Sequence, residues 1–184
     1  GDHVVKLDTL GACSSKNMKK VTVTFTNGTV SGTEAAKPLS MTAAIGSAKG
    51  DVGTTITVPV TFNSVPESGI NNCDFKLAYD ASKLEVVSVT AGDIVTNPVV
   101  NFVANYSKAG TINFLYSDAT QGSDSISKDG AFANITFKIK SAGDHVVKLD
   151  TLGACSSKNM KKVTVTFTNG TVSGTEAAKP LSMT

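Results

Sequence analysis

The sequence alternates most clearly over residues 72–79, which read NCDFKLAY. Every second position of this stretch carries an apolar or aromatic side chain: Cys73, Phe75, Leu77 and Tyr79. Successive side chains of a strand point to opposite faces, so the pattern predicts a β-strand with one buried and one exposed face. Asn72, Asp74, Lys76 and Ala78 belong to the exposed face. Similar runs lie on both sides of this stretch and extend the prediction to the rest of the chain.

These further runs are short, rich in threonine and valine, and closed by glycine, asparagine, aspartate or proline. The predicted strands are 39–48, 54–62, 84–90, 99–106, 111–117, 132–140, 145–152 and 162–172. The alternation places Ile56, Val58, Val60 and Phe62 on one face of 54–62, and it places Ile135, Phe137 and Ile139 inward in 132–140. Residues 108–110 predict a hairpin turn, and the pair 169–170 predicts a turn or bulge. Pro59 predicts an edge strand or a bulge. About nine strands with no convincing helix predict an all-β, two-sheet sandwich or jelly roll.

The chain contains an exact duplication, because residues 1–42 and 143–184 are identical. The unique sequence is therefore 184 − 42 = 142 residues, about one domain. Residues 31–38 and their copy 173–180 are small and polar with a proline, as in a linker. We predict a terminal strand segment at 1–30, a linker at 31–40, a complete module at 41–173 and a second linker at 174–184.

Composition excludes several classes of function. The net charge is only +2 and all 17 basic residues are lysine, which argues against a nucleic-acid partner. The sequence contains no run of 18 apolar residues, which is the length a membrane-spanning helix requires. The N-terminus does not resemble a signal peptide, which a mature exported protein would also lack.

The sequence contains few residues suited to catalysis or to metal binding. Cys73 and Cys155 are the cysteines of the unique sequence, without zinc-ligand spacing. Whether they lie together is left open, and Cys73 is expected to be a small buried hydrophobe. His145 is expected on a strand surface, without a partner for a triad. Asp80, Asp93 and Asp129 are explained as turn residues, so an enzyme is the weakest interpretation.

Several motifs in order resemble type I cohesin modules of cellulosomal scaffoldins. They are 69–75 (GINNCDF), 79–80 (YD), 84–86 (LEV), 92–95 (GDIV), 110–118 (GTINFLYSD) and 126–133 (ISKDGAFA). The resemblance covers residues 41–172, and residues 1–30 resemble the end of such a module. It implies a nine-stranded β-sandwich with jelly-roll topology.

The resemblance also implies a function. Cohesins are non-catalytic modules that bind dockerins of secreted plant-cell-wall enzymes and load them onto an extracellular scaffold. The expected partner is thus a type I dockerin of a glycoside hydrolase. No cofactor is expected on this chain, because calcium is expected on the dockerin only.

The residue pattern itself points to an interaction face. Leu115 lies outward between Asn113 and Ser117, beside outward Asn72 and Asp74, so an apolar anchor is surrounded by polar groups. The family's dockerin-facing positions fall on Asn72, Asp74, Ala104, Tyr106, Leu115, Asp118 and Gly122, with Asn113 replacing an aliphatic residue. Hydrophobic alternation instead places Ala104 and Tyr106 on the core face with Val100 and Phe102.

Two alternatives come from other classes. A carbohydrate-binding module shares the sandwich architecture, but the chain has no tryptophan and three tyrosines to stack on sugars. A purely structural repeat of an extracellular protein would show no dockerin affinity.

Three alternatives are open for the duplicated segment 1–30. It is disordered, it adds to the sheet of another molecule, or it competes with 143–172 for the same place in the module. We expect the sequential arrangement 41–172 to dominate, because using 1–30 requires closing the loop 31–40. Ten residues reach at most about 35 Å, enough to join neighbouring strand ends. The displaced segment would then be free for strand-swapped self-association.

Overall fold

The computed structural model describes residues 2–6, 22–24, 26–31 and 38–176. The chain divides into two units, residues 1–37 and 38–184. In the first unit, β1 (Asp2–Val5) and β2 (Gly28–Ser31) form an antiparallel pair. All other described strands belong to the second unit.

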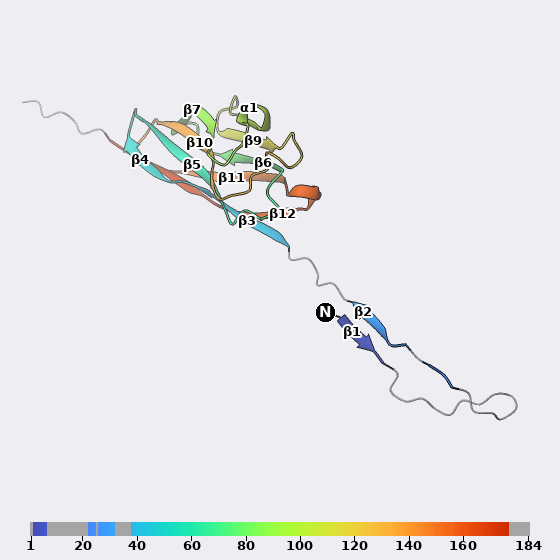
Figure 1. The fold of residues 1–184 in the computed structure, drawn as a ribbon. Helices are drawn as coiled ribbons and strands as arrows, with labels where there is room; N and C mark the ends of the chain where they lie inside the picture. The colour runs from blue at the N-terminus through green and yellow to red at the C-terminus, as the bar shows by residue number, and fades with distance from the viewer. Residues whose placement is uncertain (1, 7–21, 25, 32–37, 177–184) are drawn as a thin grey trace, which may run out of the picture. The chain divides into compact units, whose positions relative to one another are not determined.

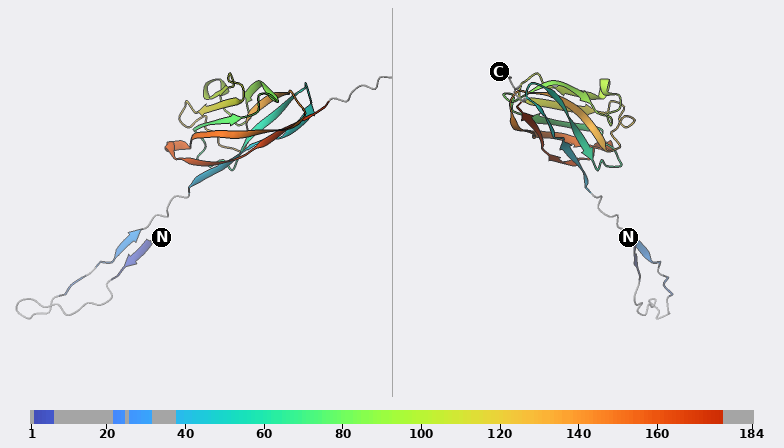
Figure 2. Two further views of the ribbon diagram at one scale, coloured as in Figure 1. Left: turned by 180° about the vertical axis from the view of Figure 1, so that it is seen from behind. Right: turned by 90° about the vertical axis from the view of Figure 1, so that its left-hand side faces the viewer.

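The second unit is a sandwich of two sheets (Figures 1 and 2). The five-stranded sheet contains, in order, β12 (Val163–Thr168), β3 (Leu39–Ile45), β5 (Thr55–Asn63), β10 (Gly130–Ile139) and β7 (Leu84–Ala91). The six-stranded sheet contains β4 (Ala48–Asp51), β13 (Gly170–Thr175), β11 (Gly143–Ser156), β6 (Asn72–Ala78), β9 (Thr111–Ser117) and β8 (Phe102–Asn105). The all-β sandwich prediction is confirmed.

Two strand runs change sheets part-way along their length. The run β3–β4 and the run β12–β13 lie side by side in parallel, with Leu39 opposite Val163 and Asp51 opposite Thr175. Gly46 and Gly170 occupy the two corners, and a Cβ on Gly170 would overlap the Gly46 carbonyl oxygen. The predicted break at 169–170 is therefore a change of sheet. Counting each run as one strand turns the eleven segments of this unit into the predicted nine.

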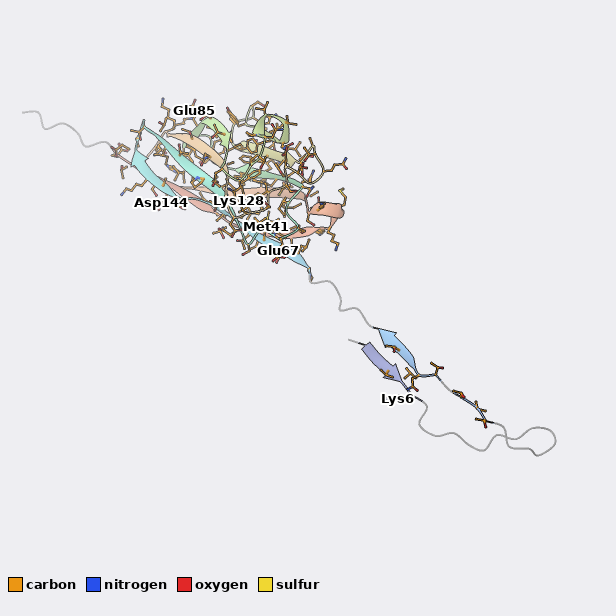
Figure 3. The ribbon with its side chains drawn as sticks, viewed as in Figure 1. Lys6, Met41, Glu67, Glu85, Lys128 and Asp144 are labelled. Atoms are coloured by element: carbon orange, nitrogen blue, oxygen red, sulfur yellow. The ribbon has the colours of Figure 1, made fainter. Side chains whose placement is uncertain are left out.

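Side chains that alternate inward from both sheets fill the space between them (Figure 3). The predicted inward residues of β5, β6 and β10 are confirmed, for example Val58, Leu77 and Ile135, which are fully buried. Aromatic rings gather at the centre around Phe132, whose ring stacks on Phe62 at a centroid distance of 4.5 Å. One continuous core thus joins the two sheets and holds their outer faces rigid.

Several local predictions were wrong. The strand β5 is central rather than at an edge. Pro59, which has no N–H to donate, is tolerated because its neighbour β3 ends at Ile45. Beyond that end, the Gly46 N–H still donates to the Pro59 carbonyl oxygen. Residues 98–101 form a short helix, α1 (Pro98–Asn101), which follows from the proline at its first position. His145 is buried rather than on the surface, with its Nε2 2.8 Å from the Ser141 carbonyl oxygen.

The segment boundaries also shift. Strand β3 begins at Leu39, as the predicted strand 39–48 does, and so overlaps the linker predicted at 31–40. Strand β13 continues to Thr175, inside the linker predicted at 174–184. Strand β11 continues to Ser156 and is followed by the 3₁₀ turn η1 (Lys158–Met160). Among the described residues, neither helical element is long and apolar enough to cross a bilayer.

Candidate functional site

The outer face of β6, β9 and β8 forms a regular grid of side chains, which we call the β6–β9–β8 face. In one row, Asp74 lies opposite Leu115, which lies opposite Val103. The next row contains Lys76, Asn113 and Asn105, and Asn72 faces Ser117 at the other end. Leu115 and Val103 are exposed and apolar, and polar groups lie on both sides of them. This is the arrangement predicted around Leu115.

The Asp74 side chain connects this face to β11 by a hydrogen bond. Its Oδ1 accepts a hydrogen bond of 2.6 Å from the Ala154 N–H, where β11 bulges between Leu152 and Cys155. A Cβ on Gly153 would overlap the Asp74 carboxylate, so a glycine at this position lets the carboxylate lie over the β11 backbone. Asp74, Asn113 and Gly153 border a shallow hollow on the face.

Two cysteines lie beneath this connection. Cys73 of β6 is opposite Cys155 of β11, and both are buried free thiols. The hydrogen bond with Cys155, together with burial, raises the pKa of the Cys73 thiol far above its ordinary value. Since the thiolate is the reactive form, Cys73 acts as a small buried hydrophobe, as predicted.

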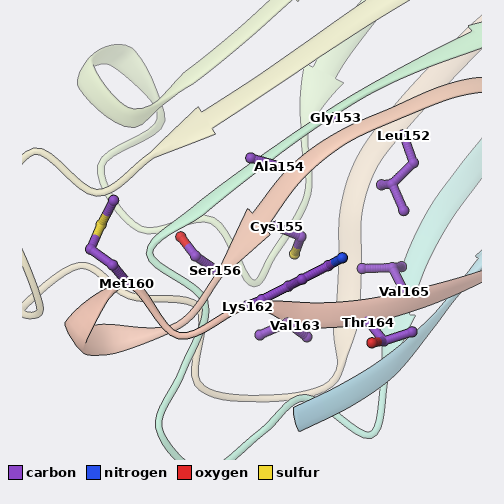
Figure 4. Close-up of a pocket in the computed structure, with 10 residues that line it drawn as sticks. All are labelled: Leu152, Gly153, Ala154, Cys155, Ser156, Met160, Lys162, Val163, Thr164 and Val165. Atoms are coloured by element: carbon purple, nitrogen blue, oxygen red, sulfur yellow. The ribbon is translucent and has the colours of Figure 1, made fainter. Parts of the chain in front are cut away.

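An apolar pocket separates the far part of β11 from β12 (Figure 4). Its lining includes Leu152, Cys155, Lys162, Val163 and Val165. Lys162 and Cys155 are the ionisable side chains among the described residues that line it. The described part of the chain contains no cluster of His, Cys, Asp or Glu that could hold a metal ion.

Of the two predicted positions Ala104 and Tyr106, only Ala104 is placed differently from what the resemblance implied. Ala104 packs against the core, and its neighbours Val103 and Asn105 are the exposed residues. Hydrophobic alternation was therefore right for Ala104, and Val103 takes the outward place opposite Leu115. Tyr106 is exposed, as the resemblance implied, because it lies beyond the end of β8.

Asp118 does not offer its carboxylate at the surface. It is buried, and its Oδ1 accepts hydrogen bonds from the Thr120 N–H at 2.8 Å and the Thr120 hydroxyl at 2.6 Å. Burial opposes ionisation, but these hydrogen bonds outweigh it and hold the pKa of Asp118 below its ordinary value. The carboxylate therefore orders the loop that follows β9. Gly122 lies in this loop at a positive φ of 144°, against Lys158.

This assignment predicts a pH-dependent effect for Asp118→Asn. A depressed pKa stabilises the fold above the unfolded-state pKa, and this contribution is lost as the pH falls through the folded-state value. The variant should be less stable than the parent at pH 7, and the gap should narrow below about pH 4. Urea unfolding between pH 3 and pH 7 measures this, with Glu85→Gln, an exposed carboxylate of β7, as the control. A gap that stays constant with pH would contradict the role of the carboxylate.

Two surface residues beside the site were not predicted from the sequence. Val103 could have been found by following the alternation from Phe102, which packs inward. Met160 is strongly exposed at a φ of 57° and lines a polar pocket with Asn72, Asp118 and Lys158. No sequence signal marks Met160, because only the tertiary structure brings η1 next to Asn72 and Asp118.

Residues 41–173 match the family model of the cohesin domain. The chain belongs to the cohesin family. Its cohesin domain is similar to the seventh ScaB type I cohesin of Pseudobacteroides cellulosolvens, at 43% identity and a TM-score of 0.74 over 78% of this chain and 97% of that one. It is also similar to the OlpA cohesin in a type I cohesin–dockerin complex from Clostridium thermocellum, at 33% identity and a TM-score of 0.71 over 74% and 99% of the two chains.

Curated relatives of this cohesin are much longer proteins. The chain is 51% identical over 104 residues to cellulose-binding protein A of Clostridium cellulovorans, which is 56% of this chain and 6% of that protein. It is 33% identical over 174 residues to cellulosomal-scaffolding protein A of Acetivibrio thermocellus, 89% of this chain and 9% of that protein. The chain thus spans less than a tenth of the length of either relative.

Proposed function

We propose that this cohesin is a non-catalytic module that binds type I dockerins of secreted glycoside hydrolases and so incorporates them into a cellulosome scaffold. The observation that carries the proposal is the β6–β9–β8 face, where Leu115 and Val103 form an exposed apolar centre. Asn72, Asp74 and Asn113 surround this centre with hydrogen-bonding groups. A small apolar core with a polar rim is typical of protein interfaces.

The comparisons support the same proposal. Structures similar to this chain include cohesins solved in complex with dockerins. Relatives are named cellulosomal scaffolding and anchoring proteins, so we infer an extracellular complex, secreted or attached to the cell surface. Calcium in such a complex would belong to the dockerin, and this chain would supply no metal ligand.

The face gives the carbohydrate-binding alternative little support. Tyr116 is fully buried and its hydroxyl donates to the Asp124 carbonyl oxygen at 2.6 Å. Tyr79 packs against the core, which leaves Tyr106 as the exposed ring. One exposed ring is a poor platform for stacking sugar residues.

Calorimetric titration with a type I dockerin tests the proposal directly. We expect one-to-one binding with calcium and loss of binding with a chelator. Retention of the chain on cellulose without any dockerin affinity would favour the carbohydrate-binding alternative. No affinity for either would favour a structural repeat.

Leu115→Ala should weaken this binding by about 2 kcal/mol, or roughly thirty-fold in Kd, because the apolar centre of an interface carries much of its energy. Val87→Ala on β7 is a matched control, since Val87 is 49% exposed on the opposite sheet and Leu115 is 45% exposed. Both variants should unfold at nearly the parent urea concentration. Equal binding by both would place the interface elsewhere.

A further inference from the structure

Cys73 and Cys155 have the geometry of a cross-strand disulfide, although both are free thiols in this structure. They are direct partners in the antiparallel register of β6 and β11. The Cα atoms of such partners are about 4.5–5.5 Å apart, within the range of about 4.4–6.8 Å that disulfides span. Cys73 is fully buried and Cys155 is 4% exposed, so both side chains point into the sandwich, where their thiols are hydrogen-bonded. The fold thus brings the two sulfurs together without a movement of either strand.

The pair lies directly after a bulge in β11. The register shifts between Leu152 and Cys155, so that Gly153 and Ala154 together face the single residue Asp74. One further pair follows before β11 ends next to η1. A covalent bond at Cys155 would therefore hold the bulge against β6, together with the Ala154 N–H that binds the Asp74 carboxylate.

A pocket gives small molecules access to Cys155. Cys155 lines the apolar pocket between β11 and β12, whose volume is about 660 Å³. Its sulfur points into the space between these strands (Figure 4). Cys73 is fully buried and is not among the described residues that line the pocket. A reagent in the pocket therefore meets Cys155 first.

We propose that Cys73 and Cys155 are a thiol–disulfide exchange site, which a small-molecule disulfide converts into a cross-strand disulfide between β6 and β11. In the first step the Cys155 thiol loses its proton and attacks one sulfur of the reagent, which forms a mixed disulfide and releases one thiolate. In the second step Cys73 loses its proton and attacks the Cys155 sulfur, which expels the second thiolate. The two cysteines lose two electrons, the reagent is reduced to two thiols, and the two protons pass to these thiols.

The first step removes most of what keeps the Cys73 thiol protonated. Hydrogen bonding with Cys155 is the largest cause of the raised pKa of Cys73, followed by burial and then by the charge of Cys155. Both contributions of Cys155 end once its sulfur is bonded to the reagent. Cys73 is therefore inert in the reduced chain but becomes a nucleophile in the mixed disulfide.

Thiol exchange in the full chain tests the proposal, with the substitution Cys13→Ser so that two cysteines remain. The folded chain is treated with 2-hydroxyethyl disulfide at about pH 8, where a fraction of free thiol is ionised. Intact mass and peptide mapping should show the loss of two hydrogens and one Cys73–Cys155 disulfide, without a bound mercaptoethanol. A folded chain that keeps both thiols, or that stops at an adduct on Cys155, would overturn the proposal.

Two further variants in the same background test the order of the steps, and circular dichroism checks that each is folded. Cys73→Ser should stop at a stable mercaptoethanol adduct on Cys155. Cys155→Ser should form an adduct on Cys73 at least about ten-fold more slowly, because Cys73 is buried and only Cys155 lines the pocket. Equal rates of adduct formation in the two variants would overturn the assignment of Cys155 as the first thiol.

Thermal unfolding provides a test that needs no substitution in the core. The oxidised chain should unfold at least about 5 °C above the reduced chain, because the cross-link closes 155 − 73 = 82 residues of the unfolded chain. Dithiothreitol should return the midpoint to that of the reduced chain. The reagent should not raise the midpoint of Cys73→Ser or Cys155→Ser. An oxidised chain whose midpoint does not rise would show that the native register does not accommodate the bond, and would overturn the proposal.

Discussion

Phe132→Ala is expected to lower the free energy of unfolding of the cohesin by about 3–5 kcal/mol. The Phe132 side chain is fully buried and belongs to β10 of the five-stranded sheet. Its ring stacks on Phe62 and lies 5.6 Å from the ring of Phe75 and 5.4 Å from the ring of Phe102, centroid to centroid. Phe75 and Phe102 belong to the six-stranded sheet, so this ring joins the two layers.

The loss is large because a domain of this size is stable by only about 5–15 kcal/mol. Urea unfolding followed by circular dichroism measures it, and the midpoint should fall with little change in slope. Val103→Ala, an exposed substitution on β8, is the control and should change stability by less than about 0.5 kcal/mol. A loss below about 1 kcal/mol for Phe132→Ala would mean that the neighbouring rings collapse into the space.

Asp74→Ala should raise the Kd for a type I dockerin at least thirty-fold, about 2 kcal/mol or more. Asp74 stands beside Leu115 in the central row of the β6–β9–β8 face. Its carboxylate is already positioned by the Ala154 N–H, so a dockerin donor meets an oriented acceptor. Titration calorimetry gives the Kd, and urea unfolding of the same sample corrects for any loss of stability.

Three further variants show why binding is lost. Asp74→Asn keeps an acceptor for the Ala154 N–H but removes the charge, so an intermediate Kd would indicate a charge-assisted bond. Gly153→Ala should displace the intact carboxylate and weaken binding, whereas Gly28→Ala, whose Cβ would meet nothing within 4 Å, should not. Glu85→Ala removes an equal charge from β7 of the opposite sheet and should leave the Kd unchanged (Figure 3). Parent-like binding by Asp74→Ala would remove Asp74 from the interface.

Local alternation predicted those parts of the fold in which one strand face is buried throughout. Leu77, Val58 and Ile135 are buried as expected because a two-residue period separates core from solvent along a strand. The same rule predicted the exposed Leu115 and, applied to Phe102, would have predicted Val103. It was wrong at Val99, where a proline begins a helical turn.

The sequence by itself determined the sandwich class, the identity of the inward residues and the family motifs, because these depend on periods of a few residues. Only the tertiary structure decided that Asp118 is turned into its own loop, that Cys73 faces Cys155, and that Asp74 rests on Gly153. It also decided that residues 143–175 complete the sandwich of the second unit, as expected, since β11 pairs with β6 and β13, and β12 pairs with β3. Contacts and spans between residues distant in the chain depend on sheet order and register, which no local pattern contains.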